Sequence, residues 1–167
     1  MPHTLQSFAA RCHDILASEN NPHGRARVAA LLVEALRNQE FVEAQFTGES
    51  SERKIVYQDP DLGFCILAHE YQGPKDSGPH DHGPSWAIYG QAAGETAMAD
   101  YQLVEPAAPG EAGKVCKTRE YKLTPGVVHV YNEGDIHSPS RAGPTRLIRI
   151  EGTNLEKVSR SKFEMVS

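Results

Sequence analysis

Apolar residues in the first quarter of the chain recur at the spacing of an amphipathic helix. Between residues 5 and 17 they fall at intervals of three and four, at Leu5, Phe8, Ala9, Cys12, Ile15 and Leu16. A second run with the same spacing, Ala29, Leu32, Val33 and Leu36, predicts a helix over residues 25–38. The segment Glu19-Asn20-Asn21-Pro22 favours a break between the two helices.

After Gly48-Glu49-Ser50 the pattern changes to short apolar runs separated by clusters of Gly, Pro, Asp and Asn. We expect strands at residues 55–57, 64–68, 86–89, 95–103, 115–123, 127–131 and 146–151. About 110 residues of short strands in one chain are typical of a β-barrel or a double-sheet jelly roll. The pattern therefore predicts a mainly β protein with an N-terminal helical segment.

The composition excludes several classes of partner. With 167 residues the chain fits one domain, and 17 Lys and Arg against 22 Asp and Glu give a net charge of −5 without long runs of either sign. This disfavours nucleic acid and anionic membranes, so a small molecule is the expected partner. The sequence shows neither a leader pattern nor a membrane span, and three cysteines without a CxxC pair suit reduced thiols. A cytoplasmic location is expected.

Two histidine motifs carry the candidate chemistry. The first is Pro79-His80-Asp81-His82-Gly83-Pro84, and the second is Gly134-Asp135-Ile136-His137-Ser138. Histidines at positions i and i+2 of a strand point to the same face, so a third from a neighbouring strand could complete a three-nitrogen metal site. We therefore predict His80, His82 and His137 as metal ligands. The alternative is a pair of loop histidines that bind nothing.

These motifs resemble those of the cupin superfamily, whose small β-barrel binds a metal through HxH and a later PxGxxH motif. Residues 132–137 match the second motif, except that Asn132 stands in place of the proline. Many cupins have a glutamate ligand shortly after HxH, and those places hold Trp86 and Ala87 here. The resemblance therefore implies an all-histidine triad, as in the cysteine and 3-mercaptopropionate dioxygenases, which use three histidines on Fe(II).

The same resemblance implies the organisation of the chain. It suggests a single cupin domain over residues 1–167, with a helical preface at 1–47 and a barrel at 52–155. The barrel would be the double-stranded β-helix of the cupins, a jelly roll, and the protein would form a homodimer.

The chain departs from the thiol dioxygenases at two places. Their Ser-x-His-x-Tyr relay falls on Leu147, Arg149 and Glu151, and their substrate-carboxylate arginine falls near Lys54, with Arg53 as a rival if the register slips by one. Periodicity alone puts the face of Arg149 either in solvent or in a polar barrel interior, and the resemblance turns it towards the metal. Arg149 would then bind an anionic group, and Glu151 would move protons or hold Arg149 in place.

Four further side chains have two interpretations each. Trp86 and Tyr89 are each either a substrate contact or a core residue. Tyr131 either donates a hydrogen bond to bound oxygen or simply packs. His129 is either an additional ligand or base near the metal, or a histidine without a role there.

The first functional hypothesis is an Fe(II)-dependent dioxygenase that acts with O2 on a small anionic substrate, a thiol by resemblance only. The second is a non-redox lyase, isomerase or hydrolase using Zn, Ni or Mn, with Glu151 or Tyr131 as the base. The third is a cupin that binds a small ligand without turnover.

Overall fold

Three helices open the chain in the computed structural model, which describes residues 4–159 and 161–166. They are α1 (Leu5–Ser18), α2 (Pro22–Leu36) and α3 (Gln39–Ala44). The first two match the predicted helices, and Asn21 caps α2 by accepting a hydrogen bond from the Gly24 N–H. The third, with six residues, was not predicted because it is too short to show a periodic pattern.

In the part of the chain that the structure describes, ten strands form two five-stranded sheets, in the orders β1-β2-β9-β4-β7 and β10-β6-β5-β8-β3. The strands are β1 (Lys54–Gln58), β2 (Cys65–Tyr71), β3 (Lys75–Asp76), β4 (Ala87–Ala93), β5 (Thr96–Glu105), β6 (Gly113–Leu123), β7 (Val128–Tyr131), β8 (Ile136–Arg141), β9 (Thr145–Glu151) and β10 (Phe163–Met165). A 3-10 turn, η1 (Leu155–Lys157), lies between β9 and β10. All strand pairs are antiparallel except β10 with β6.

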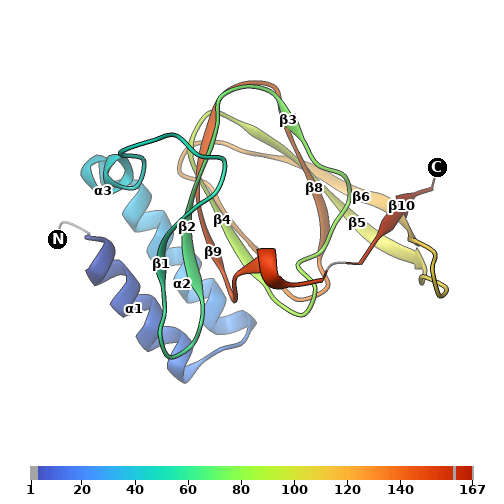
Figure 1. Ribbon diagram of the computed structural model, residues 1–167, viewed down its shortest axis with the longest axis horizontal. Helices are drawn as coiled ribbons and strands as arrows, with labels where there is room; N and C mark the ends of the chain where they lie inside the picture. The colour runs from blue at the N-terminus through green and yellow to red at the C-terminus, as the bar shows by residue number, and fades with distance from the viewer. Residues whose placement is uncertain (1–3, 160, 167) are drawn as a thin grey trace.

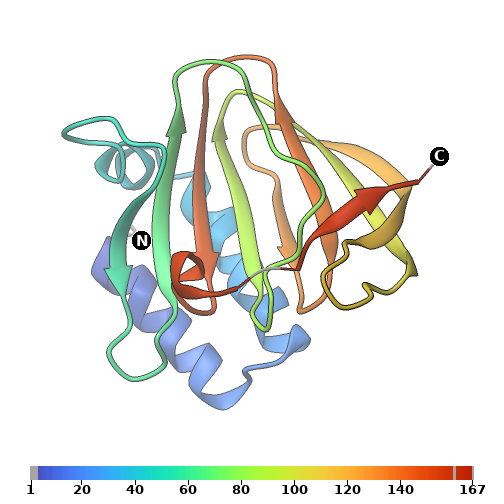
Figure 2. The same ribbon diagram turned by 45° about the vertical axis from the view of Figure 1, so that its right-hand side comes forward.

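The helices cover the outer face of the first sheet, and the second sheet lies across its inner face (Figures 1 and 2). Alternation along β9 separates the two faces: Ile148 and Ile150 pack under the helices, whereas Leu147 belongs to the smaller cluster between the sheets. Arg149 and Glu151, which share the face of Leu147, are buried as well. The face carrying Arg149 and Glu151 is therefore barrel interior rather than solvent-exposed.

The predicted fold class is confirmed: the chain is mainly β, a jelly-roll arrangement of two sheets with an N-terminal helical segment. Three strands, β3, β8 and β10, were not predicted. β3 and β10 have only two and three residues, and β8 lacks an apolar run because it reads Ile-His-Ser-Pro-Ser-Arg. Among the described residues, no helix combines the length and apolar character that crossing a membrane requires.

Candidate metal centre

Backbone pairing brings the two histidine motifs together. His80 and His137 form an antiparallel bridge in which each N–H donates to the other's carbonyl, both at 2.9 Å. Side chains at directly opposed positions of such a pair emerge on one face within about 5.5 Å of each other. The loop before β4 and strand β8 thus present one imidazole each to the same point.

Two turns set the backbone around these histidines. After His82, the Asp81 carboxylate accepts a hydrogen bond from the Gly83 N–H, and Gly83 has a φ of +61°, a conformation that favours glycine. Before His137, the Asp135 carboxylate accepts from the Asn132 N–H at 2.8 Å. Asn132, which stands where the cupin motif has proline, therefore still takes part in a tight turn that leads into β8.

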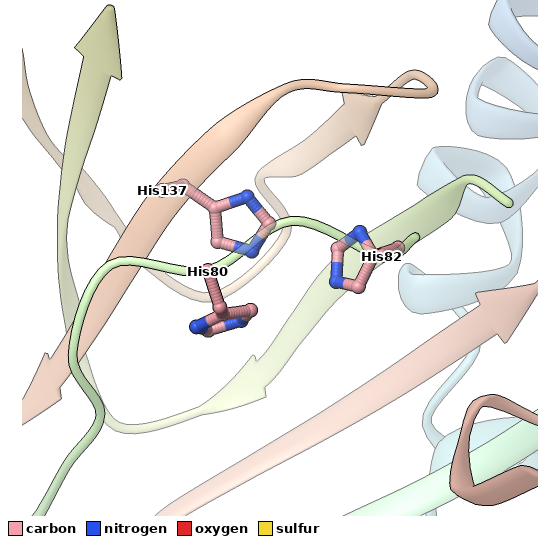
Figure 3. A group of neighbouring side chains, drawn as sticks. All are labelled: His80, His82 and His137. Atoms are coloured by element: carbon pink, nitrogen blue, oxygen red, sulfur yellow. The ribbon is translucent and has the colours of Figure 1, made fainter. Parts of the chain in front are cut away.

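The three imidazoles converge (Figure 3). One ring nitrogen from each of His80, His82 and His137 lies within 4.8 Å of the others. The Tyr89 hydroxyl lies between two of them, 3.2 Å from Nε2 of His82 and 3.3 Å from Nε2 of His137. Three imidazoles of this kind are a donor set that Fe, Zn, Ni, Cu or Mn accepts, so the residues fit a divalent transition metal.

The protonation of the cluster suits metal binding. Nδ1 of His80 lies 2.9 Å from the Gly78 carbonyl, which can only accept, so Nδ1 carries the proton and Nε2 keeps the lone pair that a metal needs. Burial, followed by the charges of His80 and His82, holds the pKa of His137 well below its ordinary value. His137 is therefore a neutral imidazole, the form that ligates metal ions.

A cavity of about 230 Å³ opens beside the cluster and reaches it at His80 and Tyr89. His82 and His137 are completely buried behind it. The cavity is lined by Glu52, Arg53, His69, Tyr71, Ser77, His80, Tyr89, Pro139, Arg141, Arg149 and Glu156. A larger hollow, about 410 Å³, lies over β5, β6 and β8, but none of the three histidines lines it. The smaller, arginine-rich cavity is therefore the approach to the candidate metal centre.

Glu151 binds two of the cavity arginines. Its carboxylate accepts from Nη1 and Nη2 of Arg53 at 3.0 and 2.9 Å and lies 3.0 Å from Nη2 of Arg149. Burial acts to raise the pKa of Glu151, but the charge of Arg149 and the hydrogen bonds from Arg53 outweigh it and leave the pKa below its ordinary value. An ionised carboxylate held this way is a weak base. Glu151 was predicted either to move protons or to hold Arg149 in place, and its contacts fit the second role.

Arg149 in turn packs on the ring of Tyr89. Its guanidinium carbon lies 4.2 Å from the centre of the Tyr89 ring, a cation–π contact. Arg149 therefore links the Glu151 carboxylate to the tyrosine whose hydroxyl touches the histidine cluster.

Two predicted substrate contacts lie elsewhere. Lys54 is outside the cavity, and its Nζ donates to the Thr47 carbonyl at 2.9 Å. The neighbouring Arg53, the rival that the sequence left open, lines the cavity. Trp86 belongs to the core under the helices, with the Arg25 guanidinium 5.1 Å from its ring centre. Its core interpretation is the one that the structure supports.

Tyr131 and His129 stack behind the cluster. The Tyr131 ring lies 4.0 Å from that of His137, and His129 is sandwiched between Tyr131 and Tyr121, with ring centres 4.5 and 5.0 Å away. The hydroxyl of Tyr131 lies 2.7 Å from that of Tyr121, and burial holds its pKa far above the ordinary value. Tyr131 thus supports the ring of His137, and His129 is not among the converging nitrogens.

Sequence reasoning missed three residues at the site, His69, Tyr71 and Arg141, and left Tyr89 open between a core residue and a substrate contact. Strand parity could have found Tyr89, because Ala87 and Tyr89 occupy the face of β4 opposite to the helix-facing Ile88. Arg141 lies four residues after His137, on the same face of β8, but β8 was not predicted as a strand.

The chain was compared with known proteins. No protein-family model matches it, and no curated protein matches it either. Among solved structures, a cupin superfamily protein from Desulfitobacterium hafniense is 11% identical, with a TM-score of 0.44 and coverage of 64% of this chain and 83% of that one. A cupin-2 domain containing protein from Shewanella frigidimarina is 10% identical, with a TM-score of 0.45 and coverage of 71% and 96%. An oxalate oxidase is 14% identical, with a TM-score of 0.44 and coverage of 60% and 46%. The solved structures similar to this chain thus include cupin superfamily proteins.

Proposed function

We propose that this protein is a metal-dependent enzyme, an Fe(II) dioxygenase that uses O2 on a small anionic substrate. The observation that carries the proposal is the convergence of three imidazoles, from His80, His82 and His137, at the inner end of an arginine-lined cavity. An Fe(II) ion on three neutral imidazoles keeps its net charge of +2 and open coordination positions, which permits oxidation of a bound substrate by O2. That the substrate contains a thiol rests on the sequence resemblance alone.

The side chains around the triad have separate tasks. The cavity arginines attract and orient the anion, and Glu151 keeps the Arg149 guanidinium in place. The Tyr89 hydroxyl lies 3.2 and 3.3 Å from Nε2 of His82 and His137 and would donate a hydrogen bond to the reacting group. His82 and His137 are fully buried, whereas His80 lines the cavity, so His80 is the ligand that faces the cavity and the solvent that fills it.

A non-redox reaction would need a general base, and neither of its two candidates is well placed. Glu151 is bound to two arginines, which hold its pKa below the ordinary value. Burial raises the pKa of Tyr131 so far that its phenolate is not accessible near neutral pH. These contacts favour the oxygenase over a lyase, isomerase or hydrolase.

The test is metal analysis of anaerobically purified protein by mass spectrometry, followed by O2 uptake with a panel of small thiols and carboxylic acids. We expect about one iron per chain in the wild type and in His129→Ala, whose imidazole stacks behind the triad without joining it. His137→Ala should lose at least tenfold in metal content, because two imidazoles remain. Substrate-dependent O2 uptake should follow the iron content.

Three results would change the conclusion. Zinc, nickel or manganese with product formed anaerobically would establish the non-redox enzyme instead. Ligand binding without any product would favour a binding protein. Equal metal content in His137→Ala and the wild type would show that the three histidines are not the metal site.

A further inference from the structure

Arg141 is a buried cation for which the described residues provide no carboxylate. It is 3% exposed, and no described Asp or Glu oxygen pairs with it within 4.0 Å. Its Nε is buried without a hydrogen-bond partner, and its guanidinium lies 4.4 Å from the centre of the Tyr71 ring. Burial lowers the pKa of Arg141, which means that the folded protein holds this charge at a cost.

The other two arginines of the cavity are already neutralised in part. Arg53 pairs with Glu151 and, through Nε at 3.1 Å, with Glu156, and Arg149 shares Glu151. Among the described residues, the three guanidinium groups thus face Glu151 and Glu156, since the third carboxylate of the cavity, Glu52, pairs with Lys75. Arg141 is the arginine left without a carboxylate. Before any metal binds, the side chains of the cavity thus carry a surplus of a single positive charge.

His69, on the neighbouring wall, offers a second unused polar atom. It is 3% exposed, Nδ1 lies 3.2 Å from the Tyr71 hydroxyl, and Nε2 is buried without a hydrogen-bond partner. Burial, and then the charges of Arg149, Arg53 and Arg141, keep the pKa of His69 well below its ordinary value, so the ring is neutral. When the Tyr71 hydroxyl donates to Nδ1, Nε2 carries the proton and is a donor.

We propose that Arg141 and His69 form the recognition site for the anionic group of the substrate, and that this group is a single carboxylate. A guanidinium fork matches the two oxygens of a carboxylate, and one surplus charge matches one negative charge rather than the two of a phosphate. A cavity of about 230 Å³ is smaller than drug-sized pockets, which indicates a ligand of few atoms. That the bound carboxylate is the substrate rests on the proposed function, whereas the binding site itself does not.

The position of Arg141 relative to the triad supports this assignment. Arg141 follows His137 by four residues on β8, so both side chains leave the strand on the same face, with Pro139 between them. A small acid held at Arg141 therefore extends along β8 towards the three histidines. In this arrangement, Arg53 and Lys54 do not bind the carboxylate: Arg53 is committed to Glu151 and Glu156, and Lys54 lies outside the cavity.

The test uses chelator-treated protein, so that it does not depend on the metal. Propionate is titrated at constant ionic strength with its neutral isostere propanamide as the reference, and binding is followed by melting temperature and by the arginine Nε–H signals in NMR. We expect propionate, but not propanamide, to raise the melting temperature and to shift the Arg141 Nε–H signal. Arg141→Met and Arg141→Lys should each weaken propionate binding at least tenfold, because neither keeps the planar fork.

The matched control is Arg146→Met. Arg146 also carries one charge and lies over an aromatic ring, that of Phe46 at 5.0 Å, but it pairs with Glu70 and Glu43 outside the cavity. Its variant should bind propionate as the wild type does. Unchanged propionate binding in Arg141→Met, or equal responses to propionate and propanamide in the wild type, would overturn the assignment.

Failure of this assignment and failure of the proposed function can be told apart. Arg141-dependent propionate binding in a protein that takes up no iron would leave the anion site in place and remove the oxygenase. Iron-dependent O2 uptake that is the same in the wild type and in Arg141→Met would support the oxygenase and remove Arg141 as the anion site.

Discussion

Glu151 is the residue that holds two of the three cavity arginines. It is completely buried, accepts two hydrogen bonds from Arg53 and lies 3.0 Å from Arg149. Glu151→Gln would leave both guanidinium groups without their common counter-charge in a largely buried site. Removing one partner of a buried ion pair costs about 3–5 kcal/mol, and we expect a loss of this size in the free energy of unfolding, measured by urea titration.

The control for this prediction is Glu52→Gln. Glu52 lines the same cavity but pairs with Lys75 at the surface, where both side chains are exposed, so its loss should change the free energy of unfolding by less than about 1 kcal/mol. If Glu151→Gln were as stable as Glu52→Gln, Glu151 would not be the anchor of the two arginines.

The three candidate metal ligands could be predicted from the sequence for a chemical reason. His80, His82 and His137 stand in short motifs whose residue types and spacing carry metal chemistry directly. Arg141 and His69 show no such motif, and their importance arises from burial and from the missing carboxylate, which only the folded chain reveals. Lys54 shows how strongly a predicted substrate contact depends on the strand register. A shift of one residue replaces Lys54, which lies outside the cavity, with Arg53, which lines it.

At the scale of elements, the alternation of apolar and polar residues predicted the strands that have one apolar face. It missed strands without such a face. The strand β9 was expected because Ile148 and Ile150 mark its helix-facing side. The strand β8 carries His137, Pro139 and Arg141 on its buried face, so its interior positions look polar in the sequence. Of the four strands whose residues line the cavity, β2, β4 and β9 have an apolar face under the helices and were predicted, whereas β8 has no such face and was missed.

A buried aspartate ties helix α1 to the loop between β1 and β2. Asp59 accepts hydrogen bonds from the Tyr57 hydroxyl and the Leu62 N–H, and lies 3.0 Å from Nδ1 of His13. The hydrogen bond to Asp59 raises the pKa of His13. Burial acts to raise the pKa of Asp59, but its hydrogen bonds from Leu62, His13 and Tyr57 lower it overall. The pair therefore consists of a cation and an anion at mildly acid pH.

This tie should make stability depend on pH with a definite sign. A histidine whose folded pKa is raised stabilises the fold below its unfolded pKa of about 6.5, and the contribution is lost as pH rises through the folded value. For Asp59 the contribution is present above about pH 3.9 and is lost as pH falls through the lowered value. We therefore expect His13→Ala to destabilise the protein more at about pH 5 than at about pH 9, measured by urea unfolding at both values.

Tyr57→Phe is the matched control for the tie. It removes another hydrogen bond to the same carboxylate, but burial raises the pKa of Tyr57, so this group does not titrate between pH 5 and 9. Its effect on the free energy of unfolding should be similar at both values. An effect of His13→Ala that does not change with pH would mean that the charge of His13 contributes nothing to the tie.

Across the whole molecule, stability and chemistry are placed on opposite faces of the first sheet. The larger apolar cluster lies between this sheet and the helices, whereas the space between the sheets contains the histidines, the tyrosines and the arginines. Substitutions under the helices should therefore change the free energy of unfolding and leave metal content unaltered. Substitutions of the three histidines between the sheets should instead lower the metal content.

The contact between α2 and β4 offers a test of this division. Gly90 is buried in β4, and a Cβ added there would lie 2.7 Å from Cδ2 of Leu32 and 3.2 Å from the carbonyl of Ile148. Gly90→Ala alone should destabilise by about 1–3 kcal/mol through overpacking. Leu32→Ala alone should destabilise by about 2–5 kcal/mol through the cavity that it leaves.

The double variant Gly90→Ala/Leu32→Ala should be more stable than the sum of the two losses predicts, because the new methyl enters space that the leucine vacates. Urea unfolding of the four proteins gives the coupling energy, and metal analysis of the same samples gives the iron content. We expect a coupling of at least about 0.5 kcal/mol and the same iron content in all four. Strictly additive losses would show that Leu32 is not what limits the side chain at position 90. A fall in iron content at temperatures where the variants remain folded would show that the helix layer also shapes the metal centre on the far face of the sheet.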